Sequence, residues 1–201
     1  MKQHQYSVHP DQVPAHLRGN RGLLSRWLGR TVLNLFGWRV DGVIPDVKRV
    51  LIIAAPHTSN WDFVFAMAAV LGLNLRIRWL GKHTIFKPGI VWFMEWLGGI
   101  PINRADPKGI VESVVELSRI EGGVALGLAP EGTRKKVVRW KTGFLRLAND
   151  LDCEILLLGF DFPGKRLVIG HLFQPTGDNE ADLAFIRAYY KQYIGKHPSQ
   201  G

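Results

Sequence analysis

Residues 49–63, RVLIIAAPHTSNWDF, decide the fold class because the chain changes within them from one structural pattern to another. The first part, RVLIIAA, is a continuous apolar run, which is typical of a strand buried on both faces of a sheet. Turn-forming residues follow from Pro56, and the apolar pattern resumes at Trp61, which predicts a helix over residues 60–71. A buried strand that leads through a turn into a helix is the repeating unit of parallel α/β sheets.

The same alternation continues on both sides of this stretch. Apolar runs predict further strands over residues 38–41, 76–80, 100–102, 124–128, 154–160 and 166–169. Helical spacing of apolar residues predicts further helices over residues 21–36, 88–97, 108–120, 143–149 and 180–194. We therefore expect a single α/β domain over residues 21–201, with a mostly parallel central sheet and helices on both faces.

The N-terminal region divides into two parts. Residues 1–20 show no periodicity and contain Pro10, Pro14 and Gly19, so we expect a flexible arm. Residues 21–36 predict an amphipathic basic helix, because leucines and Trp27 recur at helical spacing with arginines between them. Such a helix either packs on the domain with solvated arginines or lies in a lipid interface, and we favour packing on the domain.

Composition narrows the class of protein. The chain has 201 residues, of which 46% are apolar, enough for one domain with a full core. Its longest uncharged stretch, residues 63–75, is shorter than the ~18 to 20 apolar residues of a membrane-spanning helix. The polar N-terminus lacks the apolar core of a secretory signal, and the single cysteine, Cys153, excludes an intrachain disulfide. A cytoplasmic location is the expectation.

The charge balance indicates the kind of partner. Lysines and arginines number 26 against 17 acidic residues, and the resulting net charge of +9 attracts polyanions at long range. The candidate negatively charged partners are nucleic acid, anionic lipid, phosphorylated substrates and substrates on an acidic carrier protein. No spacing of histidine, cysteine and acidic residues indicates a metal site, and no resident cofactor is expected.

The segment PHTSNWD, residues 56–62, carries the first candidate chemistry. On one continuous helix His57 and Asp62 would point about 140° apart and would not face each other. If His57 lies in a turn and Asp62 in the first helical turn, the carboxylate can accept the imidazole Nδ1 proton. Nε2 would then be free to remove a proton from a substrate hydroxyl. Taken alone, the pattern is more often a capping turn with a partly buried histidine.

Two further polar clusters follow predicted strands. Residues 98–104, GGIPINR, end on Arg104, and residues 129–134, APEGTR, contain Gly132 and end on Arg134. The planar guanidinium group matches phosphate geometry, and glycine lets backbone N–H groups approach an anion closely. An isolated cluster of this kind is equally well explained as a turn with a solvated arginine. Because the carboxyl ends of parallel strands share one edge, all three clusters are expected to lie together.

Taken together, these clusters resemble the signature of the glycerolphosphate and lysophosphatidic acid acyltransferases, a superfamily with four short blocks in this order. The H-x4-D block matches residues 57–62, the G-x-I-x-I-x-R block matches residues 98–104, and P-E-G-T-R matches residues 130–134. The fourth block, a hydrophobic strand, corresponds to residues 154–160. The resemblance spans residues 40–170 and implies an α/β acyltransferase fold.

Four positions depart from the family pattern. Pro56 stands where asparagine often precedes the histidine, and Asn103 where aspartate often precedes the arginine. Lys135 replaces a common serine, and the fourth block, EILLLGF, lacks its usual proline. The His57–Asp62 pair itself is unchanged, so the departures concern the acceptor and the acyl-binding region.

The resemblance implies that His57 is the general base on an acceptor hydroxyl, with Asp62 orienting its imidazole. The acyl group would come from a thioester, either acyl-CoA or acyl carrier protein, and the acceptor would be a lysophospholipid or related glycerolphosphate. Glu131 would hold either a glycerol hydroxyl of the acceptor or the loop itself. The implied acceptor-binding set is Arg104, Glu131, Gly132, Thr133, Arg134 and Lys82.

Apolar and basic segments supply candidate surfaces for the acyl chain and the membrane. The apolar candidates for the acyl slot, which alternatively pack in the core or rest on lipid, are Ile85, Phe86, Ile90, Val91, Phe93, Met94 and Trp96. Residues 134–141, RKKVVRWK, are either a solvated loop or a contact for anionic lipid, coenzyme A phosphates or an acidic carrier protein. We expect a peripheral protein on the inner face of the cell membrane.

Two alternative functions remain open from the residues alone. A thioester hydrolase would use His57 to activate water in place of an acceptor hydroxyl. A non-catalytic basic module would bind a membrane or nucleic acid, with the three clusters as surface loops. The family resemblance favours the acyltransferase, and we expect no nucleic-acid partner.

Overall fold

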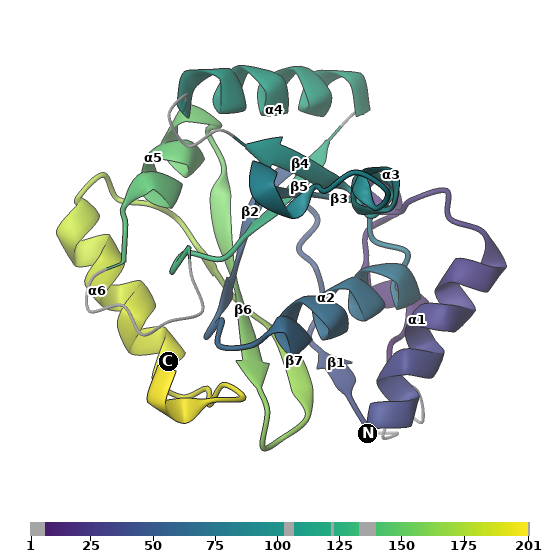
Figure 1. Cartoon of the computed structure of the whole chain (residues 1–201). Coiled ribbons are helices and arrows are strands. Elements are labelled where there is room, and N and C mark those ends of the chain that lie inside the picture. The colour runs from purple at the N-terminus through teal and green to yellow at the C-terminus, as the bar shows by residue number, and fades with distance from the viewer. Residues whose placement is uncertain (1–6, 103–106, 122, 133–139, 201) are drawn as a thin grey trace.

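The computed structural model describes residues 7–102, 107–121, 123–132 and 140–200, which contain a seven-stranded sheet (Figure 1). The strand order is β1-β7-β6-β2-β5-β3-β4, and every neighbouring pair is parallel except β6 and β7. The strands are β1 Arg39–Asp41, β2 Arg49–Ala55, β3 Ile77–Lys82, β4 Gly99–Ile102, β5 Val124–Leu128, β6 Glu154–Asp161 and β7 Arg166–Phe173. The predicted mostly parallel α/β sheet is confirmed.

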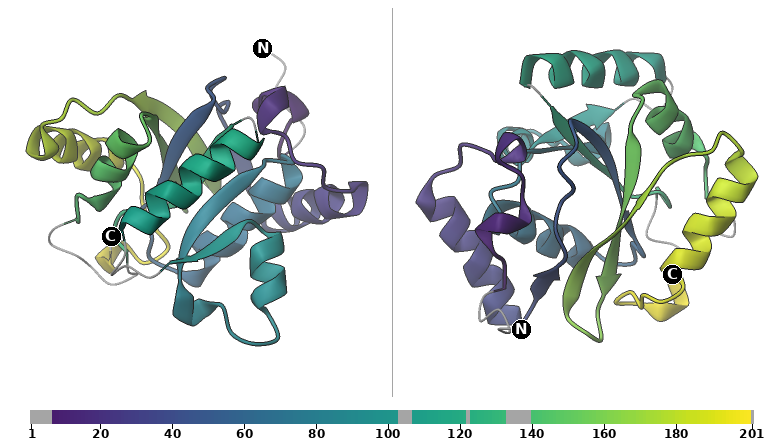
Figure 2. Two further views of the ribbon diagram at one scale, coloured as in Figure 1. Left: turned by 90° about the horizontal axis from the view of Figure 1, so that it is seen from above. Right: turned by 180° about the vertical axis from the view of Figure 1, so that it is seen from behind.

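Helices cover both faces of this sheet (Figures 1 and 2). The α-helices of the described residues are α1 Leu23–Phe36, α2 Asn60–Gly72, α3 Val91–Trp96, α4 Pro107–Glu121, α5 Gly143–Asp150 and α6 Asn179–Tyr190. One apolar core contains side chains of α1 and α2, and a second contains side chains of α4, α5 and α6. Within the described residues, no helix has the length and apolar character that crossing a bilayer requires.

The central strand β2 explains why the run RVLIIAA is apolar without alternation. Val50 and Ile52 belong to the core beneath α1 and α2, whereas Leu51, Ile53 and Ala55 belong to the core beneath α5 and α6. Successive side chains of a strand point to opposite faces, so a strand covered on both faces needs apolar residues throughout. β2 therefore ends at a fixed position in the middle of the sheet, and the turn that begins at Pro56 starts from there.

Several element ends differ from the sequence-based expectation. The helix expected over residues 88–97 is shorter, because Gly89 has a φ of +90° and the helical turn starts only at Val91. The last helix ends at Tyr190 and not at residue 194. β7 runs to Phe173, well beyond residue 169, because it pairs antiparallel with β6 as far as Ile155.

The expectation of a flexible arm over residues 1–20 is wrong for its described part, which starts at Ser7. Val8, Val13 and Leu17 are buried in the core beneath α1 and α2. Two short 3-10 helices lie in this segment: η1 Pro10–Gln12 stands between the two valines, and η2 Ala15–Leu17 ends at Leu17. Their irregular spacing gives no periodic signal, yet each apolar side chain finds a place in the core.

The helix α1 both packs on the domain and exposes apolar surface. A Cβ on Gly29 would lie 2.5 Å from the carbonyl oxygen of Ala68 and from the backbone nitrogen of Gly72, so the two helices touch at their backbones. The opposite face of α1 meets solvent and carries exposed Leu23, Leu24, Trp27, Leu28 and Leu35. The predicted packing on the domain is therefore observed, but the arginines are not on the solvated face. Arg21 and Arg30 are half-buried and donate to the carbonyls of Leu75 and Gly72, and an apolar stripe is exposed instead.

Candidate functional site

The turn between β2 and α2, residues 56–59, brings His57 and Asp62 together. Ser59 caps α2: its side chain accepts a hydrogen bond from the backbone N–H of Trp61 at 3.1 Å, and Asp62 is the acidic residue of the capping box. This places Asp62 in the first helical turn and His57 in the turn before it. The two side chains meet at 3.0 Å between His57 Nδ1 and Asp62 Oδ2.

Asp62 is fully buried and is held by the backbone of the turn. Its Oδ2 accepts hydrogen bonds from the backbone N–H groups of Thr58 at 2.7 Å and Ser59 at 2.8 Å. These contacts hold the oxygen that meets the imidazole. The His57 side chain keeps 24% of its surface exposed, and its Nε2 is the ring nitrogen left for a substrate.

Glu131 joins the turn from the neighbouring strand. It follows β5, which pairs with β2, and its Oε2 accepts a hydrogen bond from the backbone N–H of His57 at 3.0 Å. The carboxyl group is almost buried, and this burial raises its pKa to about 7, against the lowering effect of the His57 N–H and imidazole. Three successive N–H groups, from His57 to Ser59, thus donate to two carboxyl groups.

Of the other predicted site residues, the structure describes Lys82 and Gly132. Lys82 is exposed at the end of β3, two strand spacings or roughly 10 Å from β2. Gly132 has a φ of +64° and closes a turn by donating its N–H to the carbonyl of Ala129 at 3.1 Å. Arg104, Thr133 and Arg134 lie outside the described residues.

The apolar candidates for the acyl slot divide into core and surface residues. Phe86 stacks on Trp79 with ring centroids 5.6 Å apart, and Met94 also packs against the core. Val91 is half-buried. The exposed members are Ile85, Ile90, Phe93 and Trp96.

Part of the predicted basic loop can be placed. Residues 134–139 lie outside the described residues, but Trp140 is half-buried and its ring lies 5.6 Å from that of Tyr190 in α6. Trp140 is therefore a packing residue of the second core, and it does not stand free on the surface beside the basic charges.

The sequence analysis missed one set of residues beside the turn. Thr58 is buried, and its Oγ1 accepts a hydrogen bond from the backbone N–H of His197 at 3.2 Å. Gly195 packs against the same threonine. No motif connects these positions, which are far apart in the chain, so only the fold identifies them.

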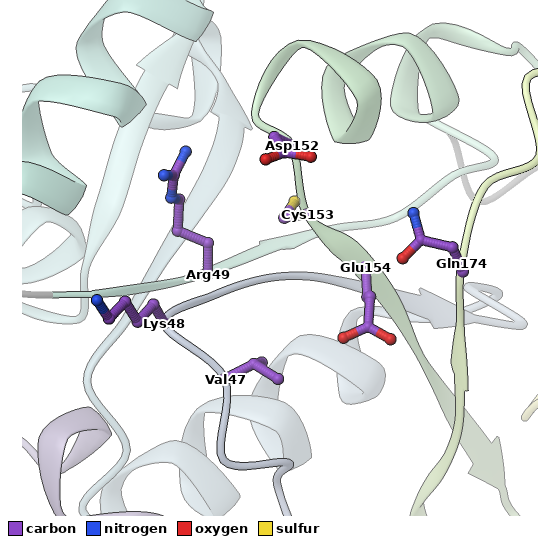
Figure 3. A pocket seen from close by; sticks show the side chains of 7 residues that line it. All are labelled: Val47, Lys48, Arg49, Asp152, Cys153, Glu154 and Gln174. Carbon is purple, nitrogen blue, oxygen red and sulfur yellow. The ribbon is translucent and has the colours of Figure 1, made fainter.

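A polar hollow of about 290 Å³ lies elsewhere in the molecule (Figure 3). Arg49 and Glu154 line it and begin β2 and β6, so it lies at the amino ends of the strands, whereas His57 follows the carboxyl end of β2. Cys153 also lines it, and burial raises the pKa of its thiol to about 11, which keeps the thiol protonated. This hollow is separate from the His57 site.

A model of a known protein family matches the part of the chain that carries this turn. The model of the family described as Acyltransferase matches residues 39–159, more than half of the chain, and this range contains His57, Asp62 and Glu131. The chain belongs to the acyltransferase family. Membership favours the enzymatic interpretations over the basic binding module.

A solved structure of a family member has a similar fold. The 1-acyl-sn-glycerophosphate acyltransferase PlsC from Thermotoga maritima has a TM-score of 0.59 and 18% sequence identity. The similarity covers 84% of this chain and 76% of that chain. This similarity supports the single α/β domain with a mostly parallel sheet.

Two curated plant proteins are also similar. The chloroplastic 1-acyl-sn-glycerol-3-phosphate acyltransferase BAT2 of Brassica napus is 23% identical over 80% of this chain, and LPAT1 of Arabidopsis thaliana is 23% identical over 72%. The chain spans 46% and 41% of the length of these two relatives.

Proposed function

We propose that this acyltransferase moves a fatty acyl group from a thioester to a hydroxyl group of a lysophospholipid or related glycerolphosphate. The donor is acyl-CoA or acyl carrier protein. The observation that carries the proposal is the 3.0 Å contact between His57 Nδ1 and buried Asp62 at the carboxyl edge of the sheet. Membership of the acyltransferase family supports the same reaction class.

His57 acts as the general base in the proposed mechanism. Its Nε2 removes the proton of the acceptor hydroxyl, and the oxygen attacks the thioester carbonyl carbon. The tetrahedral intermediate collapses with cleavage of the carbon–sulfur bond, and the imidazolium gives the proton of the acceptor hydroxyl to the leaving thiolate. Asp62 stabilises this imidazolium. General base catalysis contributes ~10² to 10⁴ in rate, and positioning and oxyanion stabilisation supply the rest.

We assign recognition of the acceptor to the residues that the family pattern implies. Lys82 is exposed at the end of β3, and Arg104, Thr133 and Arg134 complete the set. Gly132 has no side chain and a φ of +64°, and we assign its backbone to contact with the anion. Glu131 holds the His57 turn in this scheme, because its Oε2 accepts the hydrogen bond of the His57 N–H.

We also propose a peripheral location on the inner face of the cell membrane. Exposed apolar side chains gather on α1 and on α3, and Arg21 links the two helices, with its guanidinium 5.8 Å from the centre of the Trp96 ring. Aromatic residues beside arginines are typical of protein surfaces that lie at a lipid interface. An acceptor with a fatty chain is found at such a surface.

A thiol-release assay tests the reaction. Purified protein is given palmitoyl-CoA or palmitoyl-acyl carrier protein, with or without a lysophosphatidic acid, and the lipids are identified by mass spectrometry. Thiol release that requires the acceptor, with an equal amount of diacylated product, is the expected result. His57→Ala should lower the rate by at least ~10² at an unchanged thermal melt.

Two outcomes contradict the proposal. Equal thiol release without any acceptor indicates a thioester hydrolase. A rate within tenfold of wild type in folded His57→Ala removes His57 from the mechanism, because loss of a general base costs at least ~10².

A further inference from the structure

The chain returns to the His57 turn after its last long helix. Beyond α6, residues 194–197 form a segment that we call the C-terminal strap. At its start, the carbonyl of Ile194 accepts a hydrogen bond from the N–H of Phe162 at 3.0 Å, which ties the strap to the loop between β6 and β7. At its end, the N–H of His197 donates to Thr58 Oγ1 at 3.2 Å. The strap thus joins the sheet to the turn.

Gly195 makes the closest approach of the strap to the turn. A Cβ at this position would lie 2.7 Å from Thr58 Oγ1, 2.8 Å from Thr58 Cγ2 and 3.2 Å from Pro56 Cγ. No side chain fits there without displacing one of these groups. Pro56 precedes His57 and Thr58 follows it, so Gly195 packs against the turn on both sides of the histidine.

Lys196 adds a third contact, at the start of α2. Its Nζ lies 4.9 Å from the centre of the Trp61 ring, within the range of a cation–π interaction. Trp61 directly precedes Asp62 in the chain. The strap therefore contacts residues next to both members of the His57–Asp62 pair.

We propose that the C-terminal strap positions His57 and Asp62 for acyl transfer, with Thr58 and Gly195 as its positioning residues. The link is Thr58, whose hydroxyl is held by the strap while its own N–H donates to Asp62 Oδ2 at 2.7 Å. A shift of Thr58 moves this donor and with it the carboxylate that orients the imidazole. Misplacement of a reacting group by about 1 Å can cost 10²-fold in rate.

This inference rests on the proposed acyl transfer. A structural role and a positioning role of the strap can be distinguished by experiment. A purely structural strap would contribute to the free energy of unfolding and leave turnover unchanged in folded protein. A positioning strap changes kcat, because the base is misaligned, and leaves KM for the acceptor nearly unchanged, because the variants alter none of the residues assigned to the phosphate.

Four variants separate these roles. Thr58→Val removes the hydroxyl acceptor and keeps the branched shape, whereas Thr58→Ser keeps the hydroxyl. Gly195→Ala forces the strap away from Thr58, and Gly143→Ala is its matched control because a Cβ there meets no atom within 4 Å. Each variant is measured for kcat, for KM and by thermal melt, with palmitoyl-CoA and lysophosphatidic acid as substrates.

The expected result is a loss of kcat of at least about tenfold in Thr58→Val and Gly195→Ala, with KM within twofold of wild type. Thr58→Ser and Gly143→Ala should stay within about threefold of wild-type kcat. Folded Thr58→Val and Gly195→Ala proteins with wild-type kcat overturn the proposal, and so does an equal loss in Thr58→Ser and Thr58→Val.

Proton NMR spectroscopy tests the effect of the strap on His57 without an activity measurement. The His57 Nδ1 proton that faces Asp62 should give a downfield ¹H resonance that is absent in His57→Ala. This resonance should persist in Thr58→Ser and broaden or vanish in Thr58→Val. If wild type transfers no acyl group, the proposed function fails, yet an unchanged resonance in folded Thr58→Val separately overturns the strap. Should Thr58→Val not fold, Gly195→Ala against Gly143→Ala provides the same comparison.

Discussion

Asp62 combines three contacts in one buried carboxylate. It meets His57 Nδ1 and accepts the N–H groups of Thr58 and Ser59, so it both orients the imidazole and ends the turn that carries it. This double use follows from its place as the third residue of the capped helix α2. A change at Asp62 is therefore expected to affect both turnover and folding.

Asp62→Asn should lower kcat by at least ~10² with little change in KM, because an amide cannot stabilise the imidazolium as a carboxylate does. The free energy of unfolding should fall by about 1 kcal/mol, since the capping contacts weaken. Steady-state kinetics and urea denaturation measure the two effects. A rise in KM alone would place Asp62 in substrate binding.

Glu131 predicts a pH dependence of stability. Its pKa is raised by burial to about 7, so the folded protein binds this proton more tightly than the unfolded chain. The stabilisation is complete below the unfolded pKa near 4.5 and is lost as pH rises through about 7. Glu131→Gln has no such titration.

Relative to Glu131→Gln, wild type should therefore lose roughly 2 kcal/mol of unfolding free energy between pH 5 and pH 8. Urea denaturation of both proteins across this range measures the difference, in which the other titrating groups cancel. Parallel pH profiles for the two proteins would contradict the raised pKa.

The residues of the site were predictable where the chemistry is local. His57 and Asp62 lie in one turn, so a capping pattern and a change of direction suffice to bring them together. The Glu131 contact with His57 joins residues 74 apart, and the His197 contact with Thr58 joins residues 139 apart. Such contacts depend on strand order and on the path after α6, which periodicity does not encode.

At the scale of elements, the contact between α1 and α2 depends on Gly29. A Cβ there would lie 2.5 Å from two backbone atoms of α2 and 2.8 Å from the Cβ of Leu71. Backbone atoms cannot move aside as a flexible side chain can. The close approach of the two helices therefore requires glycine at this position.

Gly29→Ala should cost about 1–3 kcal/mol of unfolding free energy, although alanine favours helices, because overpacking outweighs propensity. Gly143→Ala is the control, since its Cβ meets open space at the start of α5. Urea denaturation compares the two. Equal free energies of unfolding for the two variants would show that α1 can move away from α2 without loss of stability, and would contradict the prediction.

Helices and strands were predictable wherever an apolar run is long and has one period. The residues at which they end were harder to predict, because these depend on the strands that pair with them and on local backbone conformation. β7 extends to Phe173 since β6 pairs with it there, and α3 begins late because of the conformation of Gly89. The segment after Ser7 shows the same limit: its apolar residues have no period and are buried only because the fold leaves room for them.

At the scale of the whole molecule, the exposed apolar side chains of α1 and α3 predict reversible binding to anionic membranes. Trp27 is 60% exposed on α1 and Trp92 is 66% exposed on α3. The net charge of +9 adds attraction of about 1 kcal/mol for each basic residue near an anionic surface. This attraction decays over a Debye length of ~8 Å at physiological salt.

Co-sedimentation with phosphatidylglycerol-containing vesicles should show binding at low salt that weakens as salt rises. A Trp27→Ser/Trp92→Ser double variant should lower the bound fraction at least about threefold, because interfacial aromatic contacts are lost. Ile120→Ser is the matched control, since Ile120 is 71% exposed on α4, which packs with the other core. No binding of wild type at low salt, or an equal loss in the control, would contradict a membrane-facing surface on α1 and α3.

The position of β2 in the sheet also has a consequence for how the protein acquires its fold. Its two neighbours are β5 and β6, which begin at Val124 and Glu154, so neither is adjacent to it in the chain. During synthesis, this apolar central strand therefore emerges with both hydrogen-bonding edges open and stays so until much of the remaining chain has followed. Such non-local pairing slows folding and exposes the nascent strand to aggregation or chaperone capture.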